Sequence, residues 1–197
     1  MTDPNASDTV TRIVAADDGT AYDNVAVVLH WATALIVLVN FLLAETWDWL
    51  GKPTARLMQS THMSFGVLLA VIIVMRITWR LLPGHQVSSL ERGWGRIASK
   101  LVHYLLYTLL LSEVTLGLLV QWSRGHPLPF FGVGIPTPLA TLPRAQRHEL
   151  LQIHNWVAWA IVLFALGHAL AALYRHYVVK DRVLVRMLPI RGIQEAR

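Results

Sequence analysis

Four long runs of apolar residues, separated by shorter polar segments, dominate the chain. Each run is close to or above the length of about 20 residues that an α-helix needs to cross the hydrocarbon core of a bilayer. The pattern predicts transmembrane helices near residues 25–44, 60–82, 101–122 and 150–174. Because a helix satisfies its own backbone hydrogen bonds in lipid, the expected fold class is all-α, an integral membrane four-helix bundle.

Polar sequence flanks this predicted four-helix domain, whose expected bounds are 25–176. Residues 1–24 carry several aspartates and lack the basic-then-apolar order of a secretory signal peptide, so we expect a polar N-terminal tail. Residues 177–197 are rich in arginine and are expected to form a basic cytoplasmic C-terminal segment.

The composition supports a membrane protein and excludes several kinds of site. Of the 197 residues, 54% are hydrophobic and 15% are charged, which makes a soluble bundle an unfavourable interpretation. The absence of cysteine excludes disulfides, cysteine-ligated iron–sulfur clusters and covalent c-type haem. The net charge of +5 would suit a nucleic-acid binder, but membrane proteins collect basic residues on one side for topological reasons. Nucleic acid is therefore not an expected partner, whereas the lipid bilayer is.

The basic residues predict the orientation of the bundle. An even number of spans places both termini on one side, and that side, with the second connection, holds 12 of the 17 lysines and arginines. Because the cytoplasmic side carries the excess of basic residues, both termini are expected in the cytoplasm. The tryptophans expected to form aromatic belts near the helix ends are Trp47, Trp49, Trp79, Trp94 and Trp122.

Four histidines lie inside the apolar segments and are the strongest functional signal. His154 and His168 are 14 residues apart in the fourth segment, whereas His30 and His62 lie near the starts of the first and second. Fourteen helical residues return a side chain to within roughly 40° of its first direction, about 21 Å further along the axis. The fourth helix is therefore expected to present two imidazoles to one interior at two depths.

Antiparallel packing predicts how these histidines pair. At equal depth, His30 meets His168 on the cytoplasmic side and His62 meets His154 on the periplasmic side. Imidazole suits iron, and ionisable residues within a membrane are functional candidates by default, so we predict two stacked haems. Two histidines on each iron would fill both axial positions, which favours electron transfer over chemistry at the metal. A hydrogen-bonded structural role is the alternative for any single histidine.

Small residues lie close to these positions. Gly66 is one turn from His62, Gly167 adjoins His168, and Gly117 lies on the third helix. They would allow a flat macrocycle to lie against a helix, or simply allow close helix packing.

Two charged residues occur within the predicted spans. Arg76 lies near the end of the second helix, where its side chain is expected to reach the headgroups. Glu113 lies at the middle of the third helix, where an ionised carboxylate costs at least about 2.5 kcal/mol. We expect Glu113 to be neutral or paired, with Ser112 and Thr115 as nearby hydroxyls; a proton relay is the alternative.

Short motifs spread over nearly the whole chain form a series with a definite order and spacing. They are Leu29-His30-Trp31, Thr61-His62-Met63-Ser64-Phe65-Gly66, Leu101-Val102-His103-Tyr104, Trp122-Ser123-Arg124-Gly125, Ile153-His154-Asn155-Trp156, Gly167-His168, His176-Tyr177, Lys180-Asp181 and Arg186-Met187-Leu188-Pro189. This series resembles the bacterial cytochrome b561 family. The resemblance implies a four-helix bundle in the bacterial inner membrane with two b-type haems, and its ligand positions fall on His30, His62, His154 and His168.

The resemblance also implies candidate activities in electron transport. One branch of the family oxidises superoxide at the periplasmic face and passes the electrons to ubiquinone, and a related branch provides the membrane cytochrome subunit of hydrogenases and dehydrogenases. The chain is more similar to the short, self-contained branch. Electron transfer between a periplasmic donor and membrane quinone is therefore the favoured hypothesis. The alternatives are a membrane anchor for a separate dehydrogenase, and a haem-free transporter of metal ions or protons.

Further residues are candidates for the two ends of this electron path. His103, Arg175 and His176 are expected at the cytoplasmic ends of helices three and four, where a quinone site needs proton donors. Arg175 and His176 would otherwise anchor the interface, and His103 would compete as a ligand of the cytoplasmic haem. On the periplasmic side, Arg124 and Arg144 are candidates to attract superoxide or pair with haem propionates.

Overall fold

The computed structural model describes residues 24–82, 94–180, 184 and 187. Residues 1–23 of the predicted tail and most of the predicted C-terminal segment lie outside the described residues. Met187 lies close to the bundle, because its carbonyl accepts a hydrogen bond of 2.6 Å from the indole N–H of Trp31.

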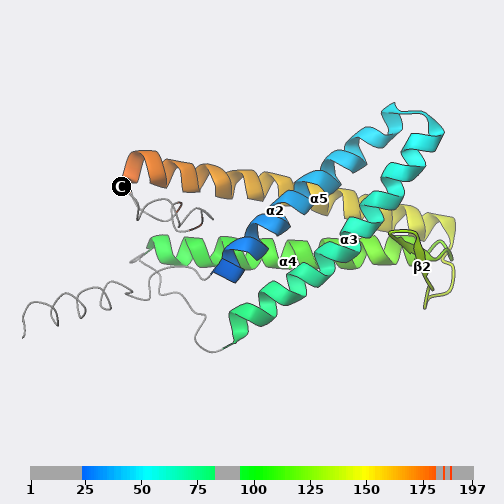
Figure 1. The fold of residues 1–197 in the computed structure, drawn as a ribbon, viewed down its shortest axis with the longest axis horizontal. Helices are drawn as coiled ribbons and strands as arrows, with labels where there is room; N and C mark the ends of the chain where they lie inside the picture. The colour runs from blue at the N-terminus through cyan, green and yellow to red at the C-terminus, as the bar shows by residue number, and fades with distance from the viewer. Residues whose placement is uncertain (1–23, 83–93, 181–183, 185–186, 188–197) are drawn as a thin grey trace, which may run out of the picture.

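Four long helices make up most of the described chain and confirm the predicted all-α four-helix fold (Figure 1). All four are long and apolar enough to cross a membrane. A short 3-10 turn, Trp47–Trp49, follows the first of them, and a π-helical turn, η2 (Arg175–Val179), follows the last. The four helices are α2 (Asn24–Thr46), α3 (Lys52–Leu81), α4 (Trp94–Trp122) and α5 (Arg144–Tyr174).

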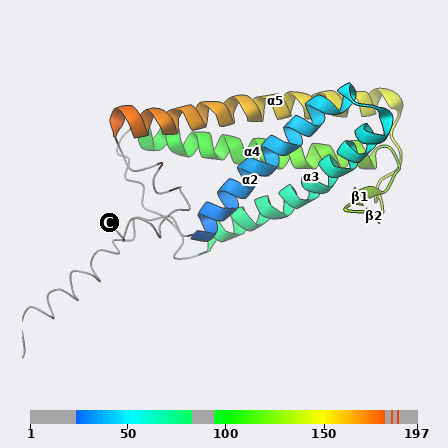
Figure 2. The same cartoon turned by 45° about the horizontal axis from the view of Figure 1, so that its top comes forward.

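The helices form two antiparallel pairs. Helices α2 and α3 make one pair, α4 and α5 make the other, and the two pairs cross obliquely (Figures 1 and 2). The buried contact between them is small and apolar, with Leu69 and Ile73 of α3 against Leu110 of α4 and Ile161 of α5. Many large apolar side chains point outward instead, as expected where lipid covers them.

Three helices begin earlier than hydropathy predicted. Helix α3 begins at Lys52 rather than at residue 60, α4 at Trp94 rather than 101, and α5 at Arg144 rather than 150. The apolar pattern marks the part of a helix that lies in hydrocarbon, whereas backbone hydrogen bonding continues through the polar turns beyond it. Gly51 and the proline in the first turn of α3 set its start, since proline fits the first helical positions.

A small β-hairpin that the sequence did not predict fills part of the connection from α4 to α5. Its strands, β1 (Leu128–Phe130) and β2 (Val133–Ile135), pair antiparallel. The hydroxyl of Ser64, which is 1% exposed, ties the hairpin to α3: it accepts from the Phe131 N–H at 3.0 Å, and donates to the Ser60 carbonyl at 2.9 Å. Gly132 occupies the turn with φ of +92°, a conformation that favours glycine.

Candidate functional site

The intramembrane histidines lie in two layers inside the bundle. In the first, which we call the Glu113 layer, the rings of His62 and His154 face each other with their centres 6.3 Å apart, and Glu113 contacts His154. The second, which we call the Arg76 layer, contains His30 and His168 with ring centres 6.4 Å apart, together with His103 and Arg76. The structure thus brings together the same pairs that equal depth predicted.

The spacing of each pair suits two axial ligands on one iron. A metal–imidazole bond of about 2 Å places each ring centre about 3 Å from the metal, so opposite ligands lie roughly 6 Å apart from centre to centre. Both measured separations, 6.3 and 6.4 Å, match this value. Among the described residues no group of three or more histidine or carboxylate side chains is placed to hold a single metal ion. A paired arrangement leaves the in-plane positions to another ligand, as a porphyrin supplies them.

His62 of the Glu113 layer is oriented by the neighbouring helix. Its Nδ1 lies 3.0 Å from the backbone carbonyl of Asn40 on α2. A carbonyl only accepts, so Nδ1 carries the proton and donates it, which leaves the Nε2 lone pair free for a metal. The ring of Trp47 packs edge-on against His62 at 5.5 Å. His62 is therefore held in the protonation state that a haem ligand requires.

His154 lies between a carboxylate and a glycine of α4. Its Nδ1 is 3.2 Å from Glu113 Oε1, and each of the two side chains is 15% exposed. This contact does not have the geometry of a hydrogen bond. Neither His154 Nδ1 nor Glu113 Oε2 has a hydrogen-bond partner among the described residues. A Cβ at Gly117 would come within 3.2 Å of His154 Cε1. A side chain at residue 117 would therefore crowd the ring, which would have to shift slightly.

A cavity of about 600 Å³ opens at the Glu113 layer. This volume is within the range of roughly 300–1,000 Å³ that is typical of cofactor and ligand pockets. His62, His154 and Gly117 line it, and both apolar and polar side chains from all four helices complete the wall. The free Nε2 of His62, the facing ring of His154 and the cavity between the helices together fit a planar haem. Histidine rings that pointed out toward lipid would not fit one.

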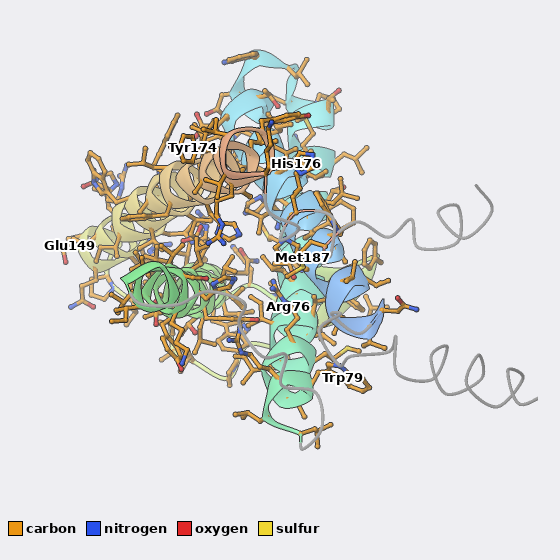
Figure 3. The ribbon with its side chains drawn as sticks, turned by 90° about the vertical axis from the view of Figure 1, so that its left-hand side faces the viewer. Arg76, Trp79, Glu149, Tyr174, His176 and Met187 are labelled. Atoms are coloured by element: carbon orange, nitrogen blue, oxygen red, sulfur yellow. The ribbon has the colours of Figure 1, made fainter. Side chains whose placement is uncertain are left out.

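The Arg76 layer is built differently. Arg76 Nη2 lies 3.3 Å from His30 Nδ1, and because guanidinium only donates, this His30 nitrogen accepts. The guanidinium also covers the ring of Tyr107, 5.2 Å from its centre. Arg76 is half-buried and contacts α2 and α4, so the expectation that it reaches the headgroups is wrong. Figure 3 views the bundle from this end and shows Arg76 on the side of α3 that faces the other helices.

His103 belongs to the Arg76 layer as a third histidine. Its ring centre is 5.2 Å from that of His168, which is shorter than the spacing of two ligands on one iron. Its Nδ1 lies 2.6 Å from the Ser99 carbonyl, so its Nε2 is free. The spacing favours His30 as the partner of His168, whereas the protonation pattern favours His103.

The other predicted site residues lie at the two ends of the bundle. Arg175 and His176 are half-buried in the π-helical turn η2, where the ring of His176 packs 4.8 Å from Tyr177. At the opposite end, Arg124 lines the cavity of the Glu113 layer. Arg144 begins α5 and is exposed, away from the residues that line this cavity.

One buried polar side chain, that of Asn40, was missed from the sequence, and the partner of Glu113, which was expected to be neutral or paired, was not predicted. Asn40 is 8% exposed, and with its amide turned to suit its neighbours it donates to the His62 carbonyl and accepts from the Gly66 N–H, both at 3.3 Å. A polar residue in the middle of an apolar span was the available signal. Glu113 contacts His154, whereas the hydroxyl of Thr115, an expected partner, donates to the Leu111 carbonyl.

Comparison with known proteins identifies similar chains over most of this length. A model of the family described as prokaryotic cytochrome b561 matches residues 21–189. Cytochrome b561 homolog 2 of Escherichia coli (strain K12) is 32% identical over 178 residues, which are 85% of this chain and 90% of the relative. Cytochrome b561 homolog 1 of the same strain is 31% identical, over 86% of this chain and 98% of the relative. A protein of Yersinia pestis named probable superoxide oxidase CybB is 26% identical, over 85% of this chain and 96% of the relative.

Proposed function

The chain belongs to the prokaryotic cytochrome b561 family of membrane haem proteins, and from this we propose that it transfers electrons through two b-type haems between a periplasmic donor and membrane quinone. The observation that carries the proposal is the pairing of histidines from different helices at the ligand spacing, 6.3 Å in one layer and 6.4 Å in the other. The two layers are about 21 Å apart along α5 by helix rise, which suits a relay between the membrane faces.

The residues of the chain hold and orient the two groups. His62 and His154 would hold one haem, and His30 and His168 would hold the other. When bound, bis-histidine haem accepts and donates single electrons and offers no open metal position to a substrate. The Asn40 carbonyl orients His62, and Gly117 gives His154 the room it needs.

Superoxide is the donor we propose at the periplasmic end. Two superoxide anions lose one electron each and become two molecules of oxygen, and the two electrons with two protons convert quinone to quinol. Arg124 supports this proposal because it places a positive charge in the cavity wall, which also carries the carboxylates of Glu45 and Asp48. The likeness to the Yersinia pestis protein named probable superoxide oxidase also supports it.

Ubiquinone is the acceptor we propose at the cytoplasmic end of a protein in the bacterial inner membrane. His103 lies next to His168, and His176 and Arg175 lie at the end of the same helix, α5. Imidazoles in these positions are suited to deliver the protons that quinone reduction needs.

The decisive test is haem quantitation on the purified protein with a dithionite-reduced spectrum. We expect two b-type haems per chain, and loss of one in His62→Ala and in His154→Ala. His126→Ala is a matched control, because this histidine is exposed and lies outside both layers. A colourless protein, or full haem content in the two ligand variants, would contradict the proposal.

A second assay tests the two ends of the path. Stopped-flow mixing of the haem-loaded protein with superoxide and a soluble quinone is expected to produce quinol at a rate that falls with added salt. Arg124→Gln is expected to slow the reaction several-fold, whereas Arg144→Gln, outside the cavity wall, is the control. Reduction of quinone only after addition of a soluble dehydrogenase would favour a membrane-anchor role instead.

A further inference from the structure

We infer that Glu113 and Arg76 give the two haems unequal reduction potentials, low in the Glu113 layer and high in the Arg76 layer, so that electrons move from the periplasmic side to the cytoplasmic side. This inference rests on the proposed function. It adds the residues that would set the direction of electron transfer between the haems, which the proposed function does not name. It also assigns a positioning role to Glu113, a residue that the proposed function does not use.

Glu113 is placed to act on the haem through His154. Its Oε1 lies 3.2 Å from His154 Nδ1, and its Oε2 is buried without an aligned partner among the described residues. Once Nε2 of His154 binds iron, the ring proton must sit on Nδ1, and Glu113 is the acceptor next to it. A carboxylate that accepts this proton makes the imidazole a stronger donor to the metal.

Arg76 places the opposite charge beside the other pair. Its Nη2 is 3.3 Å from His30 Nδ1. Binding of iron to Nε2 of His30 moves the ring proton to Nδ1, so Arg76 must then turn from this nitrogen toward Tyr107 or a haem propionate. The guanidinium stays ionised in either position, since arginine is not deprotonated in proteins. The Arg76 layer therefore keeps a positive charge close to its haem.

These charges act in opposite directions on the two redox equilibria. The ferric state carries one more positive charge than the ferrous state. A carboxylate next to a ligand therefore stabilises the ferric state and lowers the potential, whereas a guanidinium does the reverse. Both side chains lie inside the bundle, where charge interactions are stronger than in water. Glu45, Asp48 and Arg124 also line the cavity, but they are exposed and more strongly screened.

The consequence is a direction for the internal electron. One electron leaves the Glu113 layer, which is oxidised, and enters the Arg76 layer, which is reduced, with no bond made or broken. The haem held by the cytoplasmic-side pair of histidines then supplies electrons to the quinone. Arg76 raises the reduction potential of this layer even if it pairs with a propionate, because removal of Arg76 takes away a positive charge in that case too.

Optical redox titration of the purified, haem-loaded protein tests the inference. We expect two midpoint potentials. Glu113→Gln is expected to reduce the preference of its layer for ferric over ferrous haem about tenfold, a rise of about 59 mV for a one-electron couple. Arg76→Gln is expected to shift the other midpoint by a similar amount in the opposite direction. Repeating Glu113→Gln in a His30→Ala background, which retains the Glu113 layer, assigns the shifted midpoint.

Matched controls separate a local charge effect from a general one. Glu149→Gln makes the same change on α5 at an exposed position, which Figure 3 shows pointing away from the bundle, and Arg56→Gln does so at an exposed position near the start of α3. Neither is expected to move a midpoint as far. Arg76→Lys keeps the positive charge, so the midpoint potential of this layer is expected to stay close to that of the unsubstituted protein.

The outcomes distinguish this inference from the proposed function. Two haems per chain with unchanged or reversed midpoints in Glu113→Gln and Arg76→Gln would overturn the inference and leave the two haem sites in place. Protein with fewer than two haems before any substitution would instead contradict the proposed function. Electron paramagnetic resonance of the ferric protein adds a readout of ligation, in which Glu113→Gln is expected to change the signal of one haem and not the other. An unchanged spectrum would also count against the role of Glu113.

Discussion

The two histidine layers have nearly the same ring spacing but differ in how their ligands are held. In the Glu113 layer, a backbone carbonyl fixes the proton of His62 on Nδ1, and a cavity of about 600 Å³ is open beside it. In the Arg76 layer, a guanidinium contacts His30 Nδ1, and a third histidine, His103, packs against His168. The first layer is therefore arranged to receive a ligand, whereas the second has to rearrange first.

This difference shows that spacing and protonation are separate requirements for a haem site. Spacing is set by how helices cross, but the free lone pair on Nε2 is set by what each Nδ1 contacts. A site that already satisfies both requirements loses less free energy to reorganisation on binding. We therefore expect haem added in small amounts to apoprotein to occupy the Glu113 layer first.

The largest expected effect comes from the two competing ligands of the Arg76 layer. His30→Ala is expected to remove one haem, because in the part of the chain that the structure describes no other histidine ring lies at ligand spacing from His168. His103→Ala is expected to retain both haems and to slow quinone reduction. Haem content and the reduced spectrum measure the first effect, and quinol formation measures the second. The comparison of the layers fails if His103→Ala loses a haem and His30→Ala does not.

A smaller effect is expected from Gly117→Ala in the Glu113 layer. The added Cβ would meet His154 Cε1 at 3.2 Å, so the ring must shift, at a cost of about 1–3 kcal/mol. We expect haem affinity in this layer to fall about tenfold, with the other haem retained. Gly51→Ala is the control, because a Cβ there makes only an ordinary contact of 3.9 Å. Equal haem affinity in the two variants would show that His154 is not confined by α4.

Asn40→Ala is expected to act on both stability and binding. The substitution removes the amide that bridges the His62 carbonyl and the Gly66 N–H. Interhelical hydrogen bonds in membranes contribute about 0.6 kcal/mol on average, so we expect a loss of roughly 1 kcal/mol for the two contacts. Thermal unfolding in detergent measures this loss, and haem titration detects the looser His62. Asn24→Ala offers a comparison at an exposed position of α2 that does not line the cavity.

The smallest effect is expected from Ser64→Ala, which releases the β-hairpin from α3. The Phe131 N–H loses its acceptor, and the free energy of unfolding should fall by about 1 kcal/mol. Both haem midpoints are expected to stay unchanged, since the hydroxyl contacts neither layer. Proteolysis of the connection should become faster, and a shift in either midpoint would show that the hairpin influences the site.

Much of the architecture follows from simple features of the sequence. Apolar runs of membrane length predict four helices, because backbone in lipid has to be hydrogen-bonded internally. The 14-residue interval between His154 and His168 predicts two layers, because helix geometry fixes both direction and rise. The helix starts were less predictable, since polar first turns lie outside the apolar pattern, as at Lys52 and Arg144. The side of the membrane on which each layer lies stays a prediction from the distribution of basic residues.

The tertiary structure decided what surrounds each histidine. The sequence places Glu113 at mid-helix and Arg76 near a helix end, but only the crossing of the helix pairs sets one against His154 and the other against His30. Asn40, Gly117 and Ser64 gain their roles in the same way, from contacts between residues far apart in the chain. Helix periodicity is local and can be read from the chain, whereas the partner of a buried polar group depends on packing between helices, which no local pattern records.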